Sequence, residues 1–581
     1  MNLDDPEARM RSGLLRAVCV PLVILYSADP RSSQGAQTSE QEYRAAQQGD
    51  AQAVSRYRLA ADAGKAGAMR NLGLMYAQGR GVPRNDAQAV SWYRKAAAAG
   101  DTGGMINLGL MYAQGRGVPR DDARAVSWFR KAADAGAPGG MTNLGLMYAQ
   151  GLGVPRDDAQ AVSWYRKAAH AGAAGGMANL GLMYAQGRGV PRDDAQAVSW
   201  YRKAADARDA GAMTNVGFMY AQGRGVPRDD ARAVDWFRKA AHAGDAGAMR
   251  DLGLMYKNGQ GVPRDDGQAV SWFRKAAAAG DVGGMTNLGL MYERGRGVPR
   301  DDAQAVSWYR KAAGAGGAGG MTNLGVMYAQ GRGAPRDDAQ AVSWYRKAAG
   351  AGASLAMRNL GLMYEEGRGV PRDDGQAANW YRKAADAGDA GGMTNLGLMY
   401  AQGRGARRDD GQAVSWYRKA AGAGEAVGMR DLGLMYAQGR GVPRDDARAV
   451  DWFRKAAAAG DAGAMRDLGA MYENGRGVPQ HDAQAVSWYR RAAVAGDVGG
   501  MTNLGFMYAN GKGVRKDDGQ AVSWYRKAAD AGARLAMRNL GAMYALGRGV
   551  PRDEAQAAGW LRKAADAGDP VAPELLSRLA R

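Results

Sequence analysis

Carboxamide side chains recur at fixed positions along this chain and could bind a peptide backbone. An Asn and a Gln stand seven residues apart, and the pair returns at steps of 36 residues through much of the sequence. Because an amide both donates and accepts hydrogen bonds, such rows could pair with the main chain of an extended peptide. The candidate partner-binding residues are Asn107, Gln114, Asn143, Gln150, Asn179, Gln186, Asn215, Gln222, Asn287, Asn323, Asn359 and Asn395. A second interpretation stays open, in which the amides bridge adjacent repeats.

A second recurring set consists of arginines on either side of a Gly-Val-Pro segment. The candidate basic edge consists of Arg80, Arg84, Arg116 and Arg120 in the first two units. These cations could attract an acidic partner. Asp121 and Asp122 follow directly and partly neutralise them, so a solvated loop edge is the alternative interpretation.

The sequence offers little for catalysis. Its three His residues, His170, His242 and His481, are scattered, and a single Cys permits neither a disulfide within the chain nor a Cys-based zinc site. No unit combines a nucleophile, a base and an orienting group. We therefore expect no enzymatic activity, no catalytic residue, no metal site, no cofactor and no small-molecule substrate.

The elements that position these side chains are internal repeats. All 14 Trp residues lie 36 residues apart, from Trp92 to Trp560, and 28 of the 30 Met residues form two series with the same step. A period of this length indicates a solenoid or a propeller, in which each unit buries its apolar face against its neighbours.

Each unit reads as two antiparallel helices. Apolar residues at i, i+3, i+4 and i+7 from Met105 predict the first helix, and a Gly-Arg-Gly-Val-Pro-Arg turn ends it. Asp121 is the expected N-cap of the second helix, Trp128 is expected in the core, and Gly136 ends the helix. The sequence thus predicts an all-α fold, an α/α superhelical solenoid of about fourteen 36-residue helix-turn-helix repeats with partial end units.

One unit breaks the pattern at the end of its second helix. Arg208 stands where the equivalent residues are Gly136, Gly172 and Gly244. A left-handed conformation costs a non-Gly residue about 1 kcal/mol, so we expect a local weak point at this junction.

The repeat resembles a known family in its motif residues. The pattern Asn-Leu-Gly-x-Met-Tyr, then Gly-x-Gly-Val, then Asp-x-x-x-Ala-x-x-Trp-Tyr-x-Lys-Ala-Ala is similar to the Sel-one-like repeat, a relative of the tetratricopeptide repeat. The resemblance implies an α/α superhelix used as an adaptor between proteins. Cysteine-rich relatives in that family are linked to penicillin binding or hydrolysis, but this chain lacks their paired Cys residues.

The resemblance and the composition together predict the organisation of the chain. We expect a signal peptide at residues 1–28, a linker at 29–42 and the solenoid at 43–581, made of a partial first unit (43–68), full units (69–572) and a truncated C-terminal cap (573–581).

The expected signal peptide consists of basic residues followed by an apolar run. Arg9, Arg11 and Arg16 precede residues 17–26, which are too few to span a bilayer comfortably. We therefore expect an exported protein, periplasmic or secreted, with no transmembrane helix in the mature chain. A cytoplasmic protein is the alternative, and translation from Met10 would give a more usual leader.

The predicted function is a non-enzymatic scaffold that binds protein or peptide partners along the superhelix. The net charge of +20 would favour anionic partners in general. Nucleic acid is not the expected partner, because helical-repeat RNA readers vary their base-contacting side chains between units, whereas the Asn and Gln rows are nearly constant. Non-specific binding of an anionic polymer such as RNA by the basic loop edge is the alternative.

Overall fold

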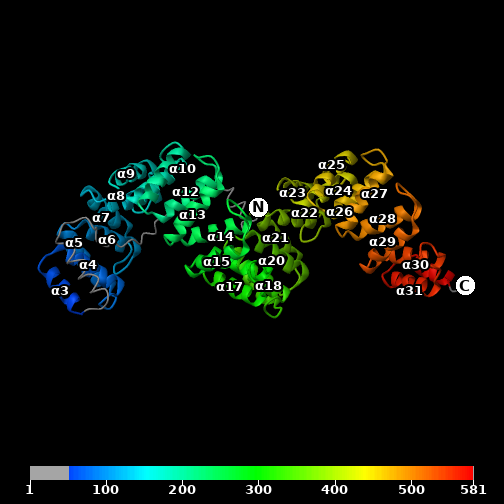
Figure 1. Ribbon diagram of the computed structural model, residues 1–581, viewed down its shortest axis with the longest axis horizontal. Helices are drawn as coiled ribbons and strands as arrows, with labels where there is room; N and C mark the ends of the chain where they lie inside the picture. The colour runs from blue at the N-terminus through cyan, green and yellow to red at the C-terminus, as the bar shows by residue number, and fades with distance from the viewer. Residues whose placement is uncertain (1–50, 580–581) are drawn as a thin grey trace. The chain divides into compact units, whose positions relative to one another are not determined.

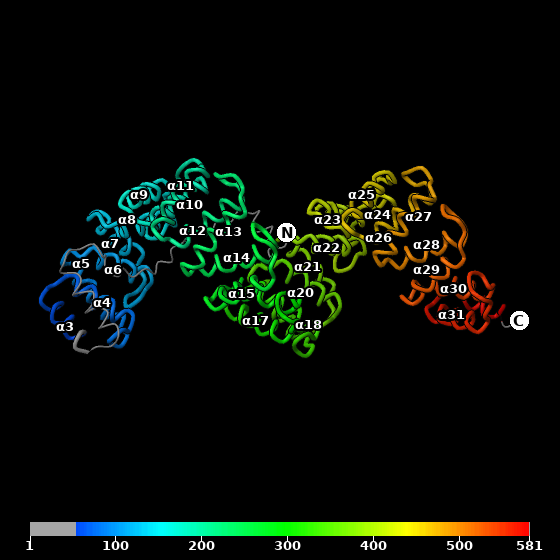
Figure 2. The backbone as a smooth tube through the Cα atoms, in the orientation of Figure 1, coloured from blue at the N-terminus to red at the C-terminus, as the bar shows by residue number. Residues whose placement is uncertain are grey.

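The computed structural model describes residues 51–579, which form thirty helices and no strand. The chain divides between Ala315 and Gly316 into two compact units, called here the N-terminal and C-terminal units (Figure 1). Within each unit, successive helices lie side by side along the chain (Figure 2). This arrangement confirms the predicted all-α solenoid. The predicted signal peptide and linker, residues 1–42, lie outside the described residues and stay predictions.

Each full repeat contains one first helix and one second helix. In the N-terminal unit the first helices are α4 (Ala66–Gln78), α6 (Thr102–Gln114), α8 (Pro138–Gln150), α10 (Ala174–Gln186), α12 (Ala210–Gln222), α14 (Ala246–Asn258) and α16 (Val282–Arg294). The second helices are α5 (Asp86–Ala98), α7 (Asp122–Asp134), α9 (Asp158–His170), α11 (Asp194–Asp206), α13 (Asp230–His242), α15 (Asp266–Ala278) and α17 (Asp302–Gly314).

The C-terminal unit has the same order. Its first helices are α18 (Ala318–Gln330), α20 (Ser354–Glu366), α22 (Ala390–Gln402), α24 (Ala426–Gln438), α26 (Ala462–Asn474), α28 (Val498–Asn510) and α30 (Arg534–Leu546). Its second helices are α19 (Asp338–Gly350), α21 (Asp374–Asp386), α23 (Asp410–Gly422), α25 (Asp446–Ala458), α27 (Asp482–Val494), α29 (Asp518–Asp530) and α31 (Glu554–Asp566). Single helices, α3 (Ala51–Asp62) and α32 (Ala572–Leu579), lie at the two ends of the array.

The local sequence explains where each helix begins and ends. Gly115 ends α6 with φ 67°, and the carboxylate of Asp121 accepts a 2.9 Å hydrogen bond from the Arg124 amide at the start of α7. Gly136 follows α7 with φ 82°. The predicted caps are therefore confirmed in this repeat.

The two helices of a repeat pack through a glycine against an aromatic ring. A Cβ atom added at Gly109 of α6 would lie 2.6 Å from the ring of Phe129 in α7, which is fully buried. The absence of a side chain lets the helices approach closely enough to offset the poor helix propensity of Gly.

The tryptophans lie at the edge of this core. Trp92 is buried, whereas Trp128 and its later equivalents are half-buried. Lys131 places its Nζ atom 4.3 Å from the centre of the Trp128 ring, so one face of the indole carries a cation. The prediction that Trp lies in the core is therefore confirmed for Trp92, whereas the later Trp residues are only half-buried and the neighbouring Tyr or Phe fills the interior.

Successive repeats meet where a loop touches the start of the preceding second helix. Gly117 has φ 67°, and a Cβ atom there would lie 2.3 Å from the carbonyl oxygen of Asp86 in the repeat before. The adjacent Arg116 donates from Nη2 to Asp86 at 2.6 Å and to the Ala77 carbonyl oxygen at 2.9 Å. We call this arrangement the arginine clamp. It joins one loop to both helices of the preceding repeat.

Three described junctions keep the glycine contact but lack the clamp. Leu152, Gln260 and Lys512 stand at the clamp position, and the adjacent glycines still lie against the preceding helix. These three junctions therefore show which natural residues can replace the clamp arginine when its contribution to stability is tested.

In each unit, first helices of neighbouring repeats approach one another more closely than second helices do. The first helices therefore form the inner layer and the second helices the outer layer. No helix between residues 51 and 579 has both the length and the apolar character needed to cross a bilayer.

Arg208 adopts the left-handed conformation expected from its position. Its φ is 65°, and its amide donates to the Ala205 carbonyl at 2.9 Å, as the Gly244 amide donates to Ala241 at 3.1 Å. The turn keeps its shape, so the arginine bears the cost of a positive φ, about 1 kcal/mol.

We expect Arg208→Gly to slow amide hydrogen exchange at residues 204–213, because it removes that cost. Gly244→Arg is the matched reverse change and should accelerate exchange at residues 240–249. Hydrogen exchange followed by mass spectrometry measures both junctions. Unchanged rates in both variants would show that the turn accepts arginine without strain.

The clamp makes a separate prediction about pH. Arg188→Leu, which copies Leu152, should destabilise its junction by about 1–3 kcal/mol, the cost of losing charged hydrogen bonds. Arg188 hydrogen bonding lowers the pKa of Asp158 from 3.8 to about 2. The clamp therefore contributes its full stability above about pH 4 and loses it as the pH falls toward 2.

Thermal unfolding of the parent and of Arg188→Leu at pH 7 and pH 2.5 checks this expectation. The two proteins should differ at the higher pH and converge at the lower one. Leu152→Arg should stabilise the protein at pH 7, because it can restore a clamp to Asp122. Equal stability of parent and Arg188→Leu at pH 7 would contradict the assignment.

Candidate functional site

The inner layer presents one stripe of each first helix. In α6 this stripe passes through Gly103, Asn107, Leu110 and Gln114, spaced i, i+4, i+7 and i+11, which share one helix face. Leu108 and Gly109 point instead into the buried interface with α7. The predicted amide rows therefore lie on a common inner stripe, together with a row of apolar residues.

The predicted asparagines differ in their exposure. Asn107, Asn179 and Asn215 are buried, with at most 4% of their surface exposed. Binding of a partner by these three residues stays a prediction. The half-buried members of the row are Asn143, Asn287, Asn323, Asn359 and Asn395.

Several of these amides connect adjacent repeats. Asn359 in α20 lowers the pKa of the Tyr345 hydroxyl in α19, and Asn395 in α22 has the same effect on Tyr381 in α21, so each amide acts on a side chain of the preceding repeat. Burial raises the pKa of Tyr345 to about 12, and the bond to Asn359 opposes that rise. Asn287 instead donates to the Gly283 carbonyl of its own helix at 3.0 Å. The bridging interpretation therefore describes Asn359 and Asn395.

The predicted glutamines lie nearer the surface. Gln150 and Gln186 are exposed, and Gln114 and Gln222 are half-buried. They stand at the last residue of their first helices, beside the loops. Their contact with a partner stays a prediction.

The loop arginines are largely committed to the protein itself. Arg116 forms the clamp, and Arg120 binds Asp122 within its own loop at 2.8 Å. Arg84 likewise binds Asp86 at 3.0 Å, and Arg80 is exposed. Sequence reasoning found the neutralising Asp residues but missed their second partner, because the clamp joins residues 30 positions apart.

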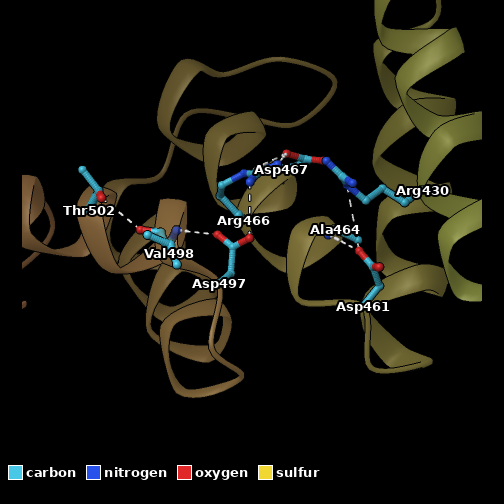
Figure 3. Close-up of polar contacts among 9 residues, drawn as sticks. Arg430, Asp461, Ala464, Arg466, Asp467, Asp497, Val498 and Thr502 are labelled. Atoms are coloured by element: carbon cyan, nitrogen blue, oxygen red, sulfur yellow. Dashed lines mark hydrogen bonds and ion pairs between the residues drawn. The ribbon is translucent and has the colours of Figure 1, made fainter. Parts of the chain in front are cut away.

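An ion network runs through three repeats of the C-terminal unit (Figure 3). Asp467 of α26 accepts hydrogen bonds from Arg430 of α24 at 2.7 Å and from Arg466 at 2.8 Å. Arg466 also reaches Asp497, at the N-cap of α28, at 3.3 Å. The sequence contains a clue to this network, since each Asp in the amide row follows an Arg.

Asp431 lies beside this network in surroundings that disfavour its ionised form. Burial raises its pKa to about 6, and the carboxylates of Glu425, Asp461 and Asp467 add to the rise, while Arg430 opposes it. The first helices here therefore hold more acidic than basic groups, and this excess of negative charge disfavours the ionised form of Asp431.

The described residues give no indication of a metal site or of a catalytic arrangement. Between residues 51 and 579, no group of three or more His, Cys, Asp or Glu side chains is placed to hold a metal ion. His170 and His242 instead lie edge-on to Trp200 and Trp272 of the following repeats, with ring centres 6.3 and 6.2 Å apart. The inner stripe carries amides that can form hydrogen bonds, apolar side chains and carboxylates. These groups are suited to binding a protein or peptide.

The raised pKa of Asp431 predicts an unusual dependence of stability on pH. A folded pKa near 6 against 3.8 unfolded means that the folded chain is destabilised once Asp431 ionises, fully above about pH 6 and not below about pH 4. We expect Asp431→Asn, which copies Asn395, to raise the free energy of unfolding at pH 7 by up to about 3 kcal/mol. At pH 4 the two proteins should be similar.

Chemical unfolding at the two pH values measures this effect. Asp467→Asn provides a control of opposite sign, because it removes the acceptor shared by Arg430 and Arg466 and should destabilise the chain at pH 7. A loss of stability at pH 7 in both variants would contradict the description of Asp431.

Comparisons with known proteins find three solved structures that are similar to this chain. A solved protective antigen of uropathogenic Escherichia coli, c5321, which displays an SLR fold, is 32% identical over 84% of this chain and 97% of its own, with a TM-score of 0.48. A Sel1 repeat protein from Oxalobacter formigenes is 36% identical over 53% of this chain and 89% of its own, with a TM-score of 0.41. The Helicobacter pylori cysteine rich protein B is 29% identical over 22% of this chain and 92% of its own, with a TM-score of 0.19.

A search of curated proteins finds no match. The Sel1 repeat matches residues 66–101, 103–136, 138–172, 174–209, 210–245, 246–281, 283–317, 318–352, 354–389, 390–425, 426–461, 462–497, 499–532 and 534–569. These segments cover nearly all of the described helices, and the resemblance seen in the motif residues is confirmed. The chain belongs to the Sel1 repeat family.

Proposed function

We propose that this protein is a non-enzymatic scaffold that binds a protein or peptide along the inner stripe of its first helices. One observation carries the proposal. Of the eight exposed large apolar side chains among the described residues, five lie on this stripe in the C-terminal unit. They are Leu398, Val427, Phe506, Leu535 and Leu546.

These five residues occupy equivalent positions in different repeats. Leu398 and Phe506 take the position of Leu110, Val427 and Leu535 that of Gly103, and Leu546 that of Gln114. Exposed apolar residues that share one face mark a surface for a partner more strongly than isolated ones do.

The charge of the first helices from α22 to α28, which carry Leu398, Val427 and Phe506, indicates what such a partner carries. From Asp389 to Glu473 and Asp497, the first helices and their N-caps hold seven carboxylates against Arg430 and Arg466, a net charge of −5. The segment that best complements this surface combines apolar residues with Lys or Arg.

The alternative of an anionic polymer on the basic loop edge has less support. Over the fourteen loops, from the first Gly of each to the residue that begins the second helix, the charges sum to +1. Most loop arginines also bind a neighbouring carboxylate, as Arg120 binds Asp122. This edge is nearly neutral.

We expect the double change Leu398→Ser and Phe506→Ser to reduce retention of a protein partner about tenfold or more, since both side chains would be buried on binding. The measurement is affinity capture from an extract of the native host, with bound proteins quantified by mass spectrometry. Val494→Ser is the matched control, because Val494 is exposed on the second helix α27.

Circular dichroism should show the same helix content in all three proteins. Equal capture by the parent and the double variant, or equal losses in the double variant and the Val494 control, would contradict binding by the inner stripe.

A further inference from the structure

The excess positive charge of this chain lies almost entirely on its outer layer. Every second helix of a full repeat carries an Arg followed by a second cation, from Arg94 and Lys95 to Arg562 and Lys563. With Ser91 and Ala98 these positions follow the spacing i, i+3, i+4 and i+7, so they share one helix face. We call the equivalents of these four positions the outer ridge.

The charge of the outer ridge accounts for that of the whole protein. Its twenty-eight cations stand against seven aspartates, which leaves +21, while the chain carries +20. The seven are Asp134, Asp206, Asp235, Asp386, Asp451, Asp530 and Asp566. The charges of all other residues nearly cancel and sum to −1.

Contacts with neighbouring aromatic side chains hold these cations in place. The Nζ atom of each ridge lysine lies 3.9 to 4.3 Å from the centre of the Trp ring three residues earlier. Most ridge arginines reach a Tyr hydroxyl of the following first helix, as Arg130 donates to Tyr148 at 2.7 Å. Cations that are already positioned lose little side-chain entropy when they bind an anion.

We propose that the outer ridge of each unit binds the phosphates of a flexible single-stranded nucleic acid, without regard to base sequence. Each unit contributes seven cation pairs, exposed or half-exposed at the surface. The pairs recur once per repeat, so each unit presents a continuous row of like charges. This surface lies on the opposite layer from the inner stripe and goes beyond the proposed function.

A flexible strand fits this surface better than a membrane or a duplex does. The second helices of the N-terminal unit follow a curved path from α5 through α11 to α17 (Figure 2). A planar bilayer, or a duplex with a persistence length of about 50 nm, would meet only part of such a row. Val494 is the one large apolar side chain on the ridge, which leaves little to insert into lipid.

The ridge also lacks the variation that base reading requires. Arg and Lys repeat in every second helix, with Arg491 as the single replacement of the lysine, and most units carry Ser at the first position. A reader of base sequence changes its contacting side chains from repeat to repeat. The expected contacts are therefore to phosphates alone.

The test measures binding of a fluorescent oligo-uridylate to the full chain by anisotropy, at salt concentrations from about 50 to 200 mM. We expect log K to fall linearly with log salt. Lys383→Gln, Lys419→Gln and Lys455→Gln together should make the slope shallower by about 2, since each phosphate contact with a single strand contributes about 0.7. The corresponding Lys→Arg changes should leave the slope unchanged, because Arg491 already lies 4.4 Å from the centre of the Trp488 ring.

A matched control removes three cations from the loops of the same repeats. Arg372→Gln, Arg408→Gln and Arg444→Gln delete the same charge at residues that are about 60% exposed and paired with carboxylates. This variant should keep the parent slope. Equal effects of the two triple changes would show that binding follows net charge alone and would overturn the proposal.

A second variant covers the case in which the Lys→Gln protein loses helix. Ser343→Asp, Ser487→Asp and Ser523→Asp add acidic residues on the ridge at the position where the chain already carries Asp235 and Asp451. These changes should weaken oligo-uridylate binding at low salt at least tenfold. No binding by the parent at about 50 mM salt, or tighter binding to anionic phospholipid vesicles or to duplex RNA, would overturn the proposal.

Discussion

The contact between a loop glycine and the backbone of the preceding repeat sets the geometry of junctions within each unit. Gly117 and its equivalents combine a left-handed φ with a distance to the neighbouring main chain that no Cβ atom could occupy. A side chain here would separate the repeats and move Arg116 away from Asp86. The arginine clamp and the close approach of the first helices therefore depend on the missing side chain.

Most of the fold could be predicted because its determinants are local. The N-cap at Asp121, the left-handed glycines and the apolar spacing from Met105 all lie within one repeat, and the 36-residue period supplies the rest. Even the exception at Arg208 follows from comparing equivalent positions.

The candidate site was less predictable, because its contacts join different repeats. Asp122 and Arg120 are neighbours in sequence, whereas Arg116 binds Asp86, and Asn359 affects the pKa of Tyr345, across a junction. A helical wheel shows which residues of one helix share a face, but it does not show which of those faces the next repeat covers. The sequence therefore identifies the amide row, but it does not show that some of these amides act on side chains of the preceding repeat.

The two layers of the solenoid carry different surfaces from the same repeat. The inner stripe of the C-terminal unit combines carboxylates with exposed apolar residues such as Phe506, and the outer ridge presents cations. Because every full repeat contributes to both surfaces, the inner stripe and the outer ridge each continue from one repeat to the next. Single substitutions can change one surface with little effect on the other.

The near-identity of the junctions also has a consequence for folding. A loop such as that of Gly117 can satisfy its contact against the start of almost any second helix, so a chain still collapsing meets many out-of-register pairings of similar energy. Leu152, Gln260 and Lys512 break this equivalence, since their loops cannot form the clamp. They distinguish positions along an otherwise uniform array, because any pairing that involves one of these loops lacks the hydrogen bonds of the clamp.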